Sequence, residues 1–137
     1  MVTSHIRYLG QLRCEAVHGP SKQTITTDAP VDNQGRGEYF SPTDLVGTAL
    51  ASCIATTMAI VAERDSINLQ GLRIDVEKHM AADKPRRISR LLLDIYMPMK
   101  ADHPAASKLE RAAAMCPVAN SLSADLQKEM NFIWQKA

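Results

Sequence analysis

Three cysteines carry the most distinctive chemistry in this sequence: Cys14, Cys53 and Cys116. Their odd number and wide spacing argue against a structural disulfide framework. A thiolate can attack the O–O bond of a peroxide and become a sulfenic acid, and a second thiol can then condense with it to a disulfide. Cys53 and Cys116 together suggest such a redox pair. Cys14 lies on the apolar face of an alternating strand, where a small core residue is expected.

The two members of the suggested pair lie in different local settings. Cys53 lies in an apolar helical stretch, and packing in a core accounts for a cysteine there equally well. Cys116 precedes Pro117 at a predicted helix break, where unpaired backbone N–H groups and the helix dipole favour a thiolate. The two cysteines are far apart in the chain, so their pairing depends on the tertiary fold.

The element that positions Cys53 is the stretch 41–65, SPTDLVGTALASCIATTMAIVAERD. Ser41 suits a helix cap, Pro42 suits the first helical position, and Asp44 stands where a capping-box acid belongs. From residue 45 to residue 62 the helix has no charge and is apolar or small on every side. Such a helix requires cover all round, which predicts a homodimer with this helix near the interface. Its many small residues argue against a membrane span.

The rest of the chain predicts short strands and two further helices. The period of two predicts strands, and helical spacing or proline placement predicts helices. The expected strands cover 5–17, 23–27, 72–80, 87–97 and 130–134, and the expected further helices cover 104–115 and 117–128. The order β-β-α-β-β-α-α-β favours a single α+β domain over residues 1–137, with antiparallel sheets packed on helices.

Composition limits the classes of partner. The formal net charge of +1 gives no electrostatic footprint for nucleic acid or for an anionic membrane surface, so neither is expected as a partner. The four histidines are scattered, so neither a zinc site nor another cofactor is expected. The first ten residues show no hydrophobic signal segment, which makes the cytoplasm the expected location.

Two motifs together resemble a known family. FSPTDLVGTALASC, which ends at Cys53, and AMCPVANSL, which contains Cys116, are similar to segments of the OsmC/Ohr family of thiol-dependent peroxidases. The resemblance implies an intertwined α+β homodimer whose long central helices are packed between antiparallel sheets. It also implies that Cys53 is the peroxidatic cysteine and Cys116 the resolving one.

The resemblance carries a functional expectation. The family reduces organic hydroperoxides, and some members reduce hydrogen peroxide, as part of an antioxidant response to oxidative stress. The reducing equivalents come from dithiols, either small molecules or lipoyl groups on proteins, and no metal or haem is involved. The alternative is a non-catalytic dimer of the same fold that binds a small molecule or lipid, or that senses redox state.

One position departs from the family pattern. A glutamate that orients an activating arginine normally follows the helix-starting proline, and Thr43 stands in its place. Cys53 lies about three turns into its helix, beyond the reach of the helix dipole, so a thiolate there needs a nearby cation. Arg36, oriented by Glu38, is the expected source, and a solvated loop pair is the alternative. Arg13, Arg86 and Arg87 also remain possible sources of this positive charge.

Overall fold

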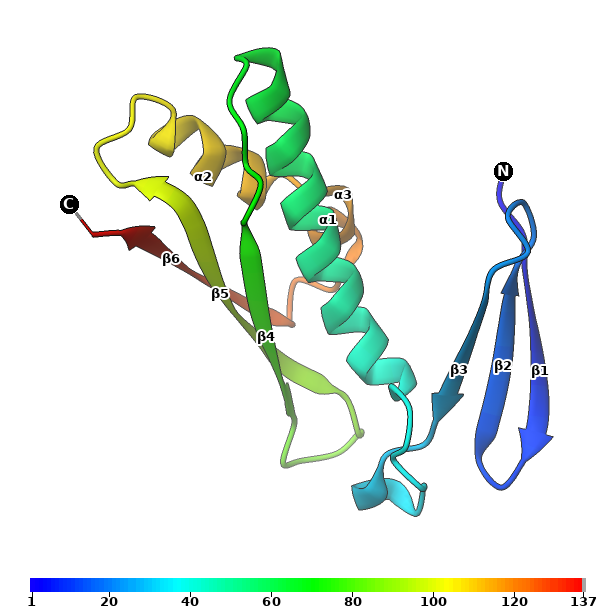
Figure 1. The fold of residues 1–137 in the computed structure, drawn as a ribbon. Helices are drawn as coiled ribbons and strands as arrows, with labels where there is room; N and C mark the ends of the chain where they lie inside the picture. Colours follow the sequence, from blue (N-terminus) through cyan, green and yellow to red (C-terminus); the bar gives the residue numbers. More distant parts are fainter. Residues whose placement is uncertain (137) are drawn as a thin grey trace. The chain divides into compact units, whose positions relative to one another are not determined.

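The computed structural model describes residues 1–136, and the chain divides into two compact units, Met1–Val46 and Gly47–Ala137. Each unit contains one three-stranded sheet (Figure 1). The structure combines two sheets with three α-helices among residues 1–136, so the predicted α+β class is confirmed. The prediction that residues 1–137 form a single domain stays a prediction.

The sheet of the first unit is an antiparallel meander of β1 (Ser4–Gly10), β2 (Arg13–His18) and β3 (Thr24–Asp28). The prediction of one strand over 5–17 is therefore wrong, because the chain reverses direction inside that range. Gly10, Gln11 and Leu12 make the turn with φ of 86°, 52° and 62°. The alternation of apolar and polar residues continues through this turn, so the sequence pattern gave no sign of the hairpin.

A loop with a single turn of 3-10 helix, η1 (Val31–Asn33), leads to the long helix α1 (Pro42–Arg64). The predicted capping box is confirmed at the start of α1. The Asp44 N–H donates to Ser41 Oγ over 3.0 Å, and the Ser41 N–H donates to the Asp44 carboxylate over 2.9 Å. Two backbone donors at the helix start are thus satisfied reciprocally, which fixes where α1 begins.

The sheet of the second unit contains β4 (Arg73–Met80), β5 (Ile88–Lys100) and β6 (Gln127–Gln135), in that order. β4 pairs with β5 antiparallel, but β6 pairs with β5 parallel, so the sheet is mixed. The expectation of purely antiparallel pairing fails here for a topological reason. The chain between β5 and β6 crosses over through α2 (Ala106–Ala114) and α3 (Pro117–Ser121), as a parallel connection requires.

The last helix is shorter than the predicted range 117–128. α3 ends at Ser121, and Leu122 is extended with φ of −85° and ψ of 153°. The Asp125 N–H then donates to Ser123 Oγ over 3.2 Å, which makes a local turn in place of a further helical turn. The chain therefore enters β6 at Gln127, three residues before the predicted strand.

The helix α1 packs across the sheet of the second unit (Figure 1). Leu50, Ile54 and Met58 of α1 are fully buried, as are Leu91 and Ile95 of β5. At Gly47 the packing is close. A methyl group at this position would lie 3.4 Å from a methyl carbon of Leu91 and 3.4 Å from one of Val76.

Within the second unit, the described residues cover only one side of α1. Ile60 is 55% exposed, and Ser52 and Thr56 are exposed as well. The expectation that α1 is buried on every side therefore fails for a single chain. By length and composition α1 is also a helix that could cross a membrane, although a core helix of a soluble protein meets the same criterion.

Candidate redox site

Cys53 lies on α1 next to the buried row of the helix, and its side chain is half-buried. The residue one turn further along is Thr57, whose Oγ1 lies 3.9 Å from Cys53 Sγ. Residues four apart on a helix project from the same face, so the spacing of the two residues accounts for this contact. Cys53 is thus a thiol that solvent can reach, with a hydroxyl group beside the sulfur.

Cys116 is the N-cap of α3, with an extended backbone at φ of −67° and ψ of 141°. Its Sγ accepts a hydrogen bond from the Ala119 N–H over 3.3 Å, and Pro117 occupies the first helical position. The predicted cap position is therefore confirmed. The Cys116 side chain is fully buried, with 0% exposure.

The two cysteines are neighbours in the structure, and both are free. Burial is the largest influence on Cys116 and raises the pKa of its thiol, and the neighbouring Cys53 raises it further. The N–H groups of Ala119 and Val118 act in the opposite direction but do not prevail.

The electrostatic expectation for Cys116 thus needs a correction. The sequence predicted that the helix cap would favour a thiolate, and the cap does lower the pKa of Cys116, but burial outweighs it. Cys116 is held as a neutral thiol beside a more accessible Cys53. This asymmetry fits a pair in which one sulfur meets an incoming reactant and the other reacts only with its neighbour.

A second cluster of polar groups lies within the first unit, around Arg13. Its Nε donates to Asp28 Oδ1 over 2.7 Å, and its Nη2 donates to Asp28 Oδ2 over 2.8 Å. The same Nη2 donates to Glu38 Oε2 over 2.8 Å. The guanidinium also lies over the Tyr39 ring, 4.7 Å from its centroid. Arg13 is therefore held in one orientation by two carboxylates and a ring.

This cluster changes the expected role of Glu38. The sequence predicted that Glu38 would orient Arg36, whereas in the structure its carboxylate bonds to Arg13. Arg36 is exposed and contributes to lowering the pKa of Asp28. Sequence reasoning missed the ion pair because it depends on the register that places Arg13 opposite Asp28. That register belongs to the pairing of β2 with β3.

The pairing of Asp28 with Arg13 predicts a stability that depends on pH. The hydrogen bonds from Arg13 hold the pKa of Asp28 below its ordinary value of 3.8, although burial acts the other way. A carboxyl group with a lowered folded-state pKa stabilises the fold above its unfolded pKa, and this contribution disappears as the pH falls through the folded-state pKa. We therefore expect Asp28→Asn to lower the melting temperature at pH 7, and to lower it progressively less as the pH falls towards about 2.

Thermal unfolding followed by circular dichroism at several pH values measures this difference. Asp102→Asn is the matched control, because Asp102 is exposed and its replacement should leave the melting temperature unchanged at each pH. If the difference in melting temperature between the wild type and Asp28→Asn stayed constant from pH 7 to pH 2, the electrostatic explanation would be contradicted.

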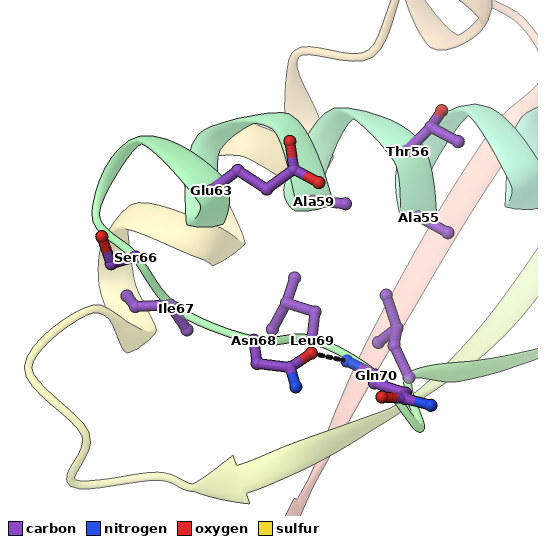
Figure 2. Close-up of a pocket in the computed structure, with 10 residues that line it drawn as sticks. Ala55, Thr56, Ala59, Glu63, Ser66, Ile67, Asn68, Leu69 and Gln70 are labelled. Carbon is purple, nitrogen blue, oxygen red and sulfur yellow. Dashed lines mark hydrogen bonds between the residues drawn. The ribbon is translucent and has the colours of Figure 1, made fainter.

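A separate pocket of about 600 Å³ lies in the second unit, between the C-terminal half of α1 and residues 66–72 (Figure 2). Ala55, Ala59 and Glu63 form its helical wall, and Leu69 and Leu72 lie opposite. A smaller pocket of about 330 Å³ shares Ala55 and Leu72 with it and continues towards β4. Neither pocket is lined by Cys53 or Cys116, so both are distinct from the candidate redox site.

Comparison with known proteins gives a consistent result. A family model described as "OsmC-like protein" matches residues 35–130. A crystal structure from Psychrobacter arcticus, provisionally named an osmotic stress induced and detoxification response protein, is 43% identical. The alignment covers 97% of this chain and 96% of that one, with a TM-score of 0.91. No curated protein matches this sequence.

More distant structures share the fold. An organic hydroperoxide resistance protein OsmC from Legionella pneumophila is 16% identical, with 96% of each chain covered and a TM-score of 0.78. The organic hydroperoxide resistance protein OhrB of Bacillus subtilis is also 16% identical, with 97% of this chain and 98% of that chain covered and a TM-score of 0.70.

Proposed function

The chain belongs to the OsmC-like protein family, and from this premise we propose that it is a thiol peroxidase that reduces organic hydroperoxides. The observation that carries the proposal is the proximity of two free thiols of unequal exposure, Cys53 and Cys116. The names of the Legionella and Bacillus structures, both organic hydroperoxide resistance proteins, support the same substrate class. A role in the response to oxidative stress follows from this activity.

The proposed reaction begins at Cys53. Its thiolate attacks the distal oxygen of the hydroperoxide, the O–O bond breaks, and the alkoxide leaves and takes up the proton that Cys53 gave up. The products are an alcohol and a sulfenic acid on Cys53. Hydrogen peroxide would react in the same way and release water instead of an alcohol.

Cys116 completes the proposed cycle. Its sulfur attacks the sulfenic sulfur of Cys53, an S–S bond forms, and hydroxide leaves with the proton of Cys116 as water. An external dithiol, either small or of the lipoyl type, then reduces the disulfide by two exchange steps and becomes oxidised itself. Burial of Cys116 suits this step because the only electrophile it must reach is its neighbour.

Steady-state consumption of peroxide tests the activity. With dihydrolipoamide as the reductant, we expect the protein to consume tert-butyl hydroperoxide faster than hydrogen peroxide at equal concentration. Consumption that does not exceed that of reductant alone, for both peroxides and also with dithiothreitol, would contradict the proposed activity.

The second candidate function is a non-catalytic dimer that binds a small molecule or lipid, or that senses redox state. It is favoured by Thr43, which stands where the family has an acid and whose Oγ1 lies 3.1 Å from the hydroxyl of the Ser41 cap. Under this alternative, Cys53 reacts with iodoacetamide no faster than an ordinary accessible cysteine at pH 7, since the thiolate is the reactive form. Under the peroxidase proposal its reaction is faster.

We propose that the positive charge that favours a Cys53 thiolate comes from Arg36, and the bond of Glu38 to Arg13 makes Arg13 a second candidate. If Arg36 has this role, Arg36→Met should slow alkylation of Cys53 at pH 7 about tenfold, as expected for the loss of a nearby opposite charge. Slowing by Arg13→Met but not by Arg36→Met would assign the charge to Arg13 instead. Peptide mass spectrometry locates the alkylated cysteine.

We further propose a cytoplasmic homodimer. The uncovered side of α1, with Ile60 55% exposed, and the adjoining pockets of the second unit support a second copy of the chain as cover. The free cysteines suit a reducing compartment. Sedimentation equilibrium should give twice the mass of the chain, and a monomer whose mass is independent of concentration would contradict the dimer.

A further inference from the structure

The hydroxyl groups on α1 around Cys53 are arranged in two different ways. Ser52 Oγ donates to the Thr48 carbonyl over 2.7 Å, and Thr56 Oγ1 donates to the Ser52 carbonyl over 2.9 Å. Both hydroxyls are thus occupied by the backbone one turn earlier, which is the usual arrangement for serine and threonine within a helix. Both side chains are also exposed.

Thr57 differs from these neighbours. Its Oγ1 lies 3.9 Å from Cys53 Sγ, and among residues 1–136 this sulfur is the one hydrogen-bonding partner of the hydroxyl. Thr57 is half-buried, so water competes with the contact less than it does at Ser52 or Thr56. The hydroxyl proton is therefore available to the sulfur.

We propose that Thr57 donates a hydrogen bond to the Cys53 thiolate and so favours the reactive form of this cysteine. A neutral thiol is a weak acceptor, whereas a thiolate is a charged one, so the bond strengthens when Cys53 loses its proton. The inference rests on the proposed role of Cys53 as the attacking thiol. The Thr57 hydroxyl would then supply part of the stabilisation of the Cys53 thiolate. In the family pattern, a glutamate at the position of Thr43 helps to provide that stabilisation.

The geometry around Cys53 is consistent with this assignment. Thr57 approaches the sulfur from the next turn of α1, and Cys116 lies near it at the start of α3. Each neighbour can donate a hydrogen bond to the sulfur, Thr57 through its O–H group and the neutral Cys116 through its S–H group. A thiolate at Cys53 would then accept two hydrogen bonds while part of its surface stays open to a reactant.

The test is the pH dependence of Cys53 alkylation by iodoacetamide, with peptide mass spectrometry to identify the modified residue. Thr57→Val has nearly the same shape but no hydroxyl. We expect it to slow alkylation at pH 7 about three- to tenfold, in keeping with the loss of a hydrogen bond to a charged group that is partly exposed, and to move the profile to higher pH. Thr57→Ser should retain the rate within about twofold, because it keeps the donor.

Thr56→Val is the matched control, since it removes a threonine hydroxyl one residue away that serves only the backbone. It should leave the profile unchanged. If Thr57→Val folds poorly, Thr57→Ala replaces it, because alanine favours helix and also lacks the donor. An unchanged profile in the variant without the hydroxyl, an equal change in Thr56→Val, or a loss in Thr57→Ser as large as in Thr57→Val would each overturn the proposal.

The alkylation measurement is independent of peroxide turnover. If the Thr57 variants shift the profile as expected while no variant and no wild-type protein consumes peroxide, the proposed peroxidase function fails and the assignment of Thr57 stands. If the wild type consumes peroxide but the profile of Thr57→Val matches it, the assignment of Thr57 fails alone.

Discussion

Cys53→Ser is expected to abolish peroxide reduction, with turnover of tert-butyl hydroperoxide falling at least about a hundredfold. A serine hydroxyl is not ionised at neutral pH and does not replace a thiolate as nucleophile, and loss of a nucleophile typically costs orders of magnitude. The substitution is small and the site is half-buried, so the fold should persist. The measurement is peroxide consumption with dihydrolipoamide in excess.

Cys14→Ser is the control for this prediction. Cys14 is a free, half-buried cysteine in β2, opposite Tyr8 and Thr27, and the proposed reaction does not use it. Its replacement should leave turnover within about twofold of the wild type. Full activity in Cys53→Ser would remove Cys53 from the reaction, and loss of activity in Cys14→Ser alone would transfer the role to Cys14.

The second large effect is expected for Cys116→Ser, which should carry out one reduction of peroxide and then stop. Cys53 would become a sulfenic acid with no neighbouring thiol to form a disulfide, and excess peroxide would oxidise it further to sulfinic acid. Serine is also a preferred N-cap residue, so α3 should keep its cap. The loss of turnover would then come from the missing thiol and not from a disturbed fold.

Mass spectrometry of Cys116→Ser after peroxide treatment measures this outcome. We expect dimedone to label Cys53 after one equivalent of peroxide, and sulfinic acid to accumulate there after an excess. In the wild type neither product should accumulate. Repeated turnover by Cys116→Ser, with Cys53 remaining a thiol, would contradict a resolving role for Cys116.

Features that depend on neighbouring residues in the chain were predictable. The start of α1 followed from Ser41, Pro42 and Asp44, because a capping box uses only local backbone donors. The N-cap position of Cys116 followed from Pro117, which disfavours helix before it and favours helix after it. The α+β class followed from the order of these local elements.

Features that depend on distant residues were not predictable in the same way. The protonation preference of Cys116 is set by burial, which the local cap does not reveal. The bond between Arg13 and Glu38 joins β2 to the loop before α1, and the parallel pairing of β6 requires the crossover through α2 and α3. The proximity of Cys53 and Cys116 likewise exists only in the tertiary fold. The Thr57 contact was open to prediction from its spacing of four residues from Cys53.

The most direct test of this account is whether Cys53 and Cys116 form a disulfide with each other when peroxide arrives. The reduced protein is treated with one equivalent of tert-butyl hydroperoxide, the remaining thiols are blocked, and the digest is analysed without reduction. We predict a peptide pair that joins Cys53 to Cys116, loss of two hydrogen masses from the chain, and Cys14 recovered as a blocked thiol. A protein that retains three free thiols, or that forms its disulfide through Cys14, would contradict the account.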